Sequence, residues 1–135
     1  KAKISNQNKS ENINDGLELY NAYITAALKC VPPEDKPLKI ELDNCSKFFN
    51  KELEYLKNLK VIVALGKIAF DACKYFYKKK LSLNGKLNFG HGEIFKLENG
   101  ISLVGCYHPS PRNVNTGRIN EKKMVELFNK IKKLN

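Results

Sequence analysis

The chain has 135 residues, of which 42% are hydrophobic, and 24 Lys and Arg residues stand against 14 Asp and Glu residues. This length fits one domain with its own core and leaves little room for a second. The longest apolar run, residues 61–65, falls far short of the roughly 20 residues that a membrane span needs. We therefore expect neither a membrane protein nor a disordered polycation, because apolar blocks recur along most of the chain.

The formal net charge of +10 favours a polyanionic partner, with nucleic acid first and an anionic membrane second. Much of the Lys excess is the kind that keeps a surface soluble. The two arginines, Arg112 and Arg118, however, lie within one stretch of seven residues. The planar arginine fork binds a phosphate or a base edge at two points, which lysine cannot do. An apolar leader is not visible, so we expect an intracellular, cytoplasmic protein.

The first part of the chain predicts a tail, a short helix and a buried strand. Residues 1–14 are polar and weakly patterned, typical of a tail or loop. Asp15 suits the N-cap of a short helix at 16–20. The apolar run at 22–28 indicates a buried strand that ends at Lys29 and Cys30. Three prolines within residues 31–37 then require a loop.

The rest of the chain alternates between helical and strand patterns. The expected elements are a helix at 39–59, a buried strand at 60–65, an amphipathic helix at 67–80, a Gly- and Asn-rich stretch, a short segment at 93–95, a turn at 99–100, a strand at 101–107, a proline-containing loop and a helix from about residue 120. The continuous β-branched run at 60–65 is typical of a strand buried on both faces. This alternation predicts an α/β fold with three αβα layers and a mainly parallel central sheet. Ligands of such folds bind at the carboxyl ends of strands.

His108 follows the last predicted strand, in a loop that two prolines stiffen. An imidazole there can donate to an oxyanion or transfer a proton. An isolated His-Pro pair more often only caps a backbone carbonyl. The donors that follow favour a functional loop, since Asn113, Asn115, Thr116 and Arg118 beside a glycine suit phosphate or base contacts.

The four cysteines do not indicate a disulfide scaffold, because a secretory signal is not visible. Cys30 and Cys45 flank fourteen residues that include the proline-rich loop, and such a loop can bring two thiolates to one metal or cluster. Two cysteines are half a ligand set, so the metal site stays an open alternative. Cys73 and Cys106 fall on apolar positions and are expected in the core. His91 is either a second functional histidine or a turn residue.

Four segments together resemble one known family. They are residues 15–37, the Asn44-Cys45 pair, residues 61–66 and residues 107–118, which reads YHPSPRNVNTGR. In this order they are similar to the iron–sulfur uracil-DNA glycosylases. The NVNTGR continuation and the ALKC segment resemble the branch called family 5, or type B.

The resemblance implies a role for each matching residue. His108 would stabilise the negative charge that grows on the departing base as the N-glycosidic bond breaks. The loop would press into the minor groove beside the extruded nucleotide, with contacts from Ser110, Arg112, Asn113, Asn115, Thr116 and Arg118. Cys30 and Cys45 would be two of the four ligands of a structural 4Fe–4S cluster.

Two departures from the family pattern affect this reading. The family's glycine-rich first motif and two further cluster cysteines are not found in this sequence, and residues 1–7 resemble the family sequence just after its first long helix. The resemblance therefore implies the C-terminal part of a glycosylase. In addition, Ala26 occupies the position where related family 4 enzymes carry a base-reading Asn. Loss of that amide implies acceptance of deaminated bases besides uracil, such as hypoxanthine and xanthine.

We therefore expect residues 1–135 to form one glycosylase-like domain of a monomeric, DNA-associated enzyme of DNA repair that flips and excises deaminated bases. One alternative is a non-catalytic nucleic-acid-binding module or a truncated, inactive glycosylase fragment. A second alternative is a small metal-binding protein without a DNA partner.

Overall fold

The computed structural model of the chain describes residues 2–80 and 86–134. Its helices are α1 (Lys39–Tyr55), α2 (Lys67–Lys80), α3 (Pro111–Asn115) and α4 (Glu121–Ile131), its 3₁₀ turns are η1 (Pro33–Asp35) and η2 (Lys132–Leu134), and its strands are β1 (Val61–Leu65), β2 (Ile94–Lys96) and β3 (Ser102–Cys106). The beginning of the Gly- and Asn-rich stretch lies outside the described residues. None of the described helices combines the length and apolar character that a membrane span requires.

The three strands form a mixed sheet in the order β1-β3-β2. β1 runs parallel to β3, with Leu65 opposite Cys106, and β2 runs antiparallel to β3. The parallel register brings the carboxyl ends of β1 and β3 to the same edge of the sheet. Because ligands of α/β folds bind at this edge, the register places the candidate site there.

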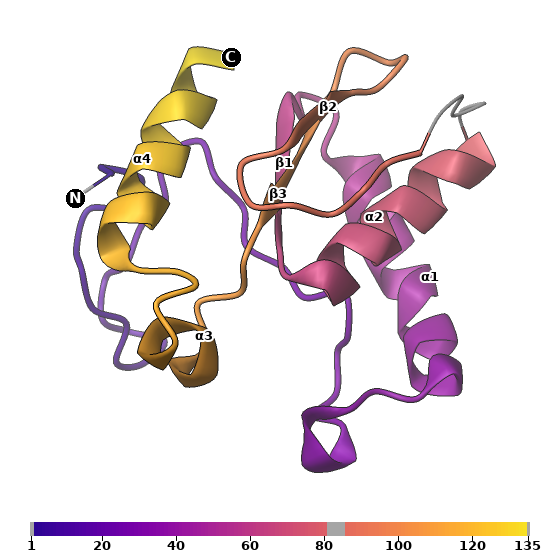
Figure 1. Cartoon of the computed structure of the whole chain (residues 1–135), viewed down its shortest axis with the longest axis horizontal. Coiled ribbons are helices and arrows are strands. Elements are labelled where there is room, and N and C mark those ends of the chain that lie inside the picture. Colours follow the sequence, from indigo (N-terminus) through magenta and orange to yellow (C-terminus); the bar gives the residue numbers. More distant parts are fainter. Residues whose placement is uncertain (1, 81–85, 135) are drawn as a thin grey trace.

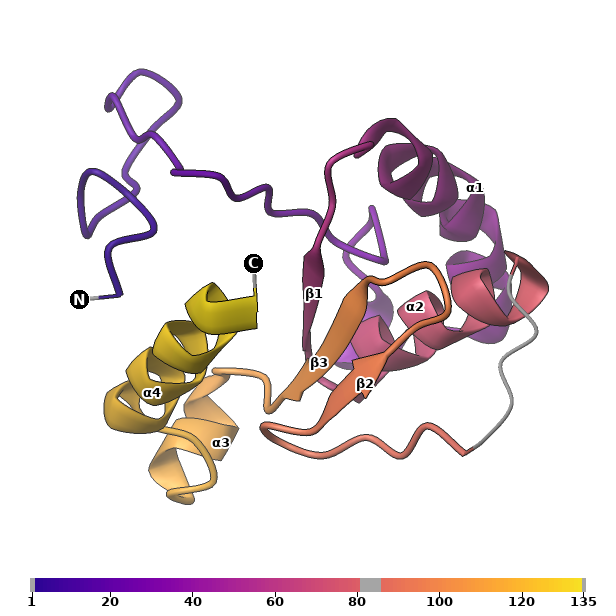
Figure 2. The same ribbon diagram turned by 90° about the horizontal axis from the view of Figure 1, so that it is seen from above.

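Helices cover both faces of this sheet (Figures 1 and 2), as the expected αβα layering requires. On one face, side chains of α1 and α2 pack with Leu103 around the fully buried Phe70. On the other face, Leu127 and Ile131 of α4 pack against β3. Leu103 and the next residue of β3, Val104, pack on opposite faces of the sheet, since side chains along a strand alternate between faces.

Most of the expected elements after residue 38 are confirmed. α2 has the predicted bounds, but α1 ends at Tyr55 rather than at residue 59. β1 is mostly half-buried, whereas the whole of β3 is buried. The prediction that residues 60–65 form a strand buried on both faces was therefore wrong about the extent of burial, although the strand itself is present. β3 has a neighbour on each side, while β1 lies at an edge of the described sheet.

Two predictions for the first thirty residues are wrong. Residues 16–20 are not helical: Gly16 has φ +76°, and Leu19 forms an isolated antiparallel bridge with Ser5. Asp15 instead accepts hydrogen bonds from the backbone N–H groups of Glu11 and Leu17, and so caps a turn. Residues 22–28 are extended but belong to no strand of the described residues. An apolar run becomes a buried strand only beside a partner strand, and Ile24 remains 74% exposed.

The extended segment is nevertheless fastened to α1. Lys29 Nζ donates to both carboxylate oxygens of Glu52, at 2.9 and 2.8 Å, and to Thr25 Oγ1 at 2.6 Å. Thr25 Oγ1 in turn donates to Glu52 at 2.5 Å. These bonds, the one from Lys29 first, lower the pKa of the Glu52 carboxyl below its ordinary value. The network fixes the position of Cys30, which follows directly, relative to α1.

Candidate active site and nucleic-acid interface

The carboxyl ends of β1 and β3 meet at Gly66 and His108. The Gly66 N–H donates to the Cys106 carbonyl at 2.7 Å and continues the parallel ladder. Gly66 has φ +97°, and a Cβ there would lie 3.2 Å from the Cβ of His108. Glycine is required here for the backbone conformation and for the close approach of the histidine. His108 is exposed, so its imidazole is open to a ligand at this edge.

The expected loop after His108 contains a helix that the sequence reading missed. α3 begins after Ser110, whose Oγ accepts the Asn113 N–H at 3.4 Å, and Pro111 occupies the first turn. A serine N-cap followed by proline is a recognised start signal, so the sequence did carry this information. The helix ends at Asn115, and the hydroxyl of Thr116, its C-cap residue, donates to the Arg112 carbonyl at 2.9 Å.

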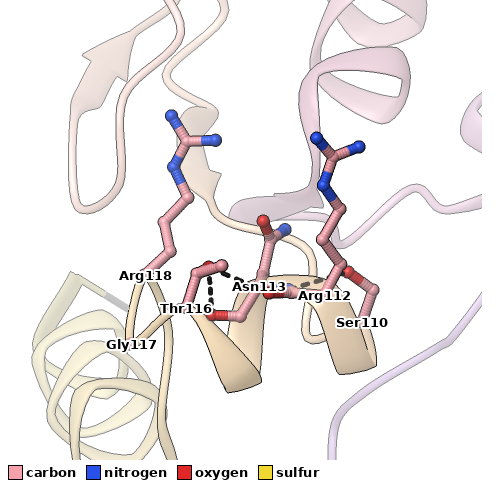
Figure 3. A pocket seen from close by; sticks show the side chains of 6 residues that line it. All are labelled: Ser110, Arg112, Asn113, Thr116, Gly117 and Arg118. Atoms are coloured by element: carbon pink, nitrogen blue, oxygen red, sulfur yellow. Dashed lines mark hydrogen bonds between the residues drawn. The ribbon is translucent and has the colours of Figure 1, made fainter.

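Five of the six residues predicted to contact DNA line one open groove of about 740 Å³. The lining residues are Ser110, Arg112, Asn113, Thr116, Gly117 and Arg118. Figure 3 shows the two guanidinium groups extending to the same side of α3, with the Asn113 amide between them. The sixth predicted residue, Asn115, is exposed and lies outside this lining. The groove thus combines the permanent positive charges of two arginines with hydroxyl and amide groups, which suits a phosphate-bearing ligand.

The groove is tied directly to His108. Asn113 Nδ2 donates to the backbone carbonyl of His108 at 2.8 Å. The Ile119 N–H donates to the Asn113 carbonyl at 3.2 Å, and the Ile119 side chain is completely buried. Asn113 therefore connects the backbone of His108, the helix α3 and the core.

Two residues that were not predicted to belong to the site, Lys123 and Tyr107, hold the end of the groove that Gly117 and Arg118 form. Lys123 Nζ of α4 donates to the carbonyls of Gly117 and Arg118, at 3.0 and 3.3 Å. The Arg118 guanidinium carbon lies 4.9 Å from the centroid of the Tyr107 ring. Nothing in the sequence distinguishes Lys123 from the other lysines of this Lys-rich chain. Tyr107 lay inside the recognised motif, but its role as a support for Arg118 depends on how the loop folds back.

The predicted metal residues Cys30 and Cys45 lie near each other. The backbone N–H of Lys29 donates to Cys45 Sγ at 3.3 Å. Partial loss of hydration, and then the neighbouring Cys45, raise the pKa of the Cys30 thiol. A bound cation would lower the pKa of the Cys30 thiol and so oppose this shift. Within the described residues no group of three or more His, Cys, Asp or Glu side chains is arranged to hold a metal ion.

The other two cysteines are in the core, as expected. Cys73 and Cys106 are 2% and 0% exposed. Burial raises the pKa of the Cys73 thiol to about 12 and that of Cys106 to about 11. Thiols that resist ionisation to this degree are poor ligands and nucleophiles.

Ala26 and His91 occupy different kinds of position. Ala26 is exposed in the extended segment. His91 lies in the turn before β2, where its Nδ1 accepts the Tyr107 N–H at 3.3 Å. The turn interpretation of His91 is thus correct, but the turn contacts the strand that leads to His108.

Comparison with known proteins gives a consistent answer. The family model described as Uracil DNA glycosylase superfamily matches residues 2–132. The chain is 37% identical over 127 residues to a type-5 uracil-DNA glycosylase of Pyrobaculum aerophilum. The aligned region covers 93% of this chain and 52% of the relative. It is 37% identical over 120 residues to the type-5 uracil-DNA glycosylase of Thermus thermophilus, covering 89% and 53% respectively.

A type-5 uracil-DNA glycosylase of Mycobacterium tuberculosis is 35% identical over 140 residues, which covers 99% of this chain and 50% of the relative. The chain thus spans about half the length of the curated relatives that it matches. The family match extends over nearly every residue, including the β-strand ends and the groove described above. The chain therefore belongs to the uracil-DNA glycosylase superfamily.

Proposed function

We propose that this chain forms the part of a DNA-repair glycosylase that grips the DNA backbone and stabilises the departing base. The observation that carries the proposal is the groove of Arg112 and Arg118 joined to His108 through Asn113. The groove presents two positive charges to the phosphates that flank an extruded nucleotide. In this proposal the base lies at the edge of the sheet, beside the exposed His108.

In the proposed reaction the N-glycosidic bond breaks and its electron pair leaves with the base. The sugar becomes oxocarbenium-like, water adds to C1′, and the proton that the water loses neutralises the departed base. The His108 imidazole donates a hydrogen bond to the oxygen of the base on which negative charge develops. A donor placed for that charge, rather than for the neutral base, accelerates the bond cleavage itself. The substrates in this proposal are uracil and other deaminated bases, because Ala26 offers no amide to select uracil.

Base release from a uracil-containing duplex tests the function. The chain with its N-terminal region restored should release uracil, and His108→Ala in the same protein should slow single-turnover release by about 100-fold or more, the usual effect of removing one donor to a developing anion. Equal rates would contradict the role of His108. Salt-sensitive DNA binding without release by the restored protein would instead support the alternative of a non-catalytic binding module.

The salt dependence of DNA affinity tests the groove. Arg112→Ala and Arg118→Ala should each lower the slope of log affinity against log salt by about 1, because each removes one phosphate contact. Lys57→Ala is the charge-matched control. Lys57 is exposed and precedes β1, so it lies toward the amino end of that strand, away from the edge with His108. An equal loss of slope in the control would show that the charge acts diffusely and would contradict a localised interface.

We further propose that Cys30 and Cys45 supply two ligands of a 4Fe–4S cluster, with the remaining ligands from outside the described residues. The support is their proximity, the Lys29 N–H bond to Cys45 and the Lys29–Glu52 network that fixes the segment. A cluster here would have a structural role and would fasten the segment before η1 to α1. Anaerobically purified protein should show thiolate-to-iron absorption that Cys45→Ser reduces and Cys73→Ser leaves unchanged. Iron content that does not depend on Cys45 would contradict the assignment.

A further inference from the structure

His91 has no part in the function proposed above, yet it contacts the residue next to His108. The His91 and Tyr107 rings are stacked, with centroids 5.3 Å apart and an interplanar angle of 27°. The Tyr107 N–H donates to His91 Nδ1. The Arg118 guanidinium also lies against the Tyr107 ring, and Phe89 packs edge-on to it at 5.9 Å. The Tyr107 ring therefore connects His91 with an arginine of the groove.

The backbone leaves His91 little freedom to move away. The Gly92 N–H donates to the Gly105 carbonyl at 2.8 Å, and the Gly105 N–H donates to the Glu93 carbonyl at 3.0 Å. A Cβ at Gly105 would lie only 2.2 Å from the Gly90 carbonyl oxygen. The turn that carries His91 is therefore pressed directly against β3, the central and fully buried strand.

The hydrogen bond from the Tyr107 N–H to His91 Nδ1 requires a neutral imidazole. Because Nδ1 accepts a hydrogen bond, the proton of the neutral ring is on Nε2. Burial, and then the positive charge of Lys123, lower the pKa of His91 and favour this neutral form. Lys123 itself holds the backbone of Gly117 and Arg118. Arg118 is thus held at its backbone by Lys123 and at its side chain by the Tyr107 ring.

We propose that His91 is a positioning residue that, through the Tyr107 ring, orients Arg118 toward a DNA phosphate. The identity of the anion rests on the proposed function. An arginine already held in its binding orientation loses less side-chain entropy when it binds. His91 makes no contact with the DNA in this proposal, and its effect passes entirely through Tyr107 and Arg118.

A double-mutant cycle on DNA affinity tests this route. His91→Ala should weaken binding of a short duplex by about threefold to fivefold, the range of an exposed cation–aromatic contact. In an Arg118→Ala background the same substitution should have no further effect. A His91→Ala penalty of the same size in both backgrounds would overturn the proposal, because a general loss of structure does not depend on Arg118.

A second measurement needs neither DNA nor catalysis. In the free full chain, the ring current of Tyr107 should shift the NMR signals of the Arg118 side chain upfield, and Tyr107→Leu should abolish this shift. His91→Ala should move the signals toward the Tyr107→Leu positions. Unchanged signals in His91→Ala would overturn the proposal. Failure of the native chain to bind DNA would instead count against the proposed function and would leave this result standing.

Discussion

Replacement of Gly105 by alanine is the sharpest test of how β3 and the His91 turn fit together. The new Cβ would lie 2.2 Å from the Gly90 carbonyl oxygen, and real Cβ contacts are essentially never below 3.0 Å. The turn must therefore retreat by at least about 0.8 Å, the difference between these two distances. β3 cannot retreat instead, because it is hydrogen-bonded on both sides and buried on both faces.

The energetic cost follows from two sources. Overpacking of a tightly packed interior costs about 1–3 kcal/mol. The displacement also weakens the two backbone bonds between Gly105 and the turn, each with a net contribution of about 1 kcal/mol. Against this, Ala is favoured over Gly by about 0.5–1 kcal/mol in an unhindered strand interior. We therefore expect the free energy of unfolding to fall by about 2–3 kcal/mol, which is less than the 5–15 kcal/mol of a typical domain.

Urea unfolding monitored by circular dichroism measures this loss. With an m-value of about 1.5 kcal/mol/M, the midpoint should fall by about 1–2 M. Gly100→Ala is the control, because an added Cβ at Gly100 has no atom within 4 Å, although the φ of Gly100, unlike that of Gly105, is in the left-handed region at +85°. It should lose only about 1 kcal/mol, from backbone strain alone. A Gly105→Ala variant as stable as the native chain, or more stable, would refute the packing argument.

Three further predictions concern the site and the core. Gly66→Ala should destabilise the chain by about 1–2 kcal/mol through its positive φ. In the proposed reaction it should also slow base release more than Gly100→Ala does, since the new Cβ would press on His108. Equal release rates in the two variants would contradict this. The pKa of Glu52 is lowered in the folded state from its ordinary 4.5. Its contribution to stability is therefore complete above that value and is lost as the pH falls through the lowered one. Glu52→Gln should flatten the acid limb of stability between about pH 5 and 3 in urea titrations, and an unchanged limb would argue against the Lys29 network. Ser102 is fully buried, and its hydroxyl has no hydrogen-bond partner among the described residues. Ser102→Ala should leave the free energy of unfolding unchanged or raise it by up to about 1 kcal/mol, which thermal unfolding would show as an unchanged or higher midpoint. A clearly lower midpoint would reveal a partner for this hydroxyl.

Local patterns predicted the elements whose side chains meet a core in the described residues. The helical period gave α2 its bounds, and the β-branched run gave β1, because both signals reflect burial against neighbours that are present. The same reasoning failed for residues 22–28, where apolar character indicated a buried strand. A strand also needs a hydrogen-bonding partner, and apolar composition says nothing about whether one is available. α3 was missed for a different reason: prolines were read as loop markers, although Pro111 after Ser110 starts a helix.

For the site, the sequence determined which chemical groups are available. It gave the histidine after the last strand, the two arginines and the two cysteines, because the resemblance and the residue types are properties of the chain itself. Only the tertiary structure decided how these groups are held. His91, Tyr107 and Arg118 are brought together by the pressing of a turn against Gly105 and by the return of the loop toward α4. Such contacts depend on the packing of elements far apart in the sequence, and no local periodicity encodes them.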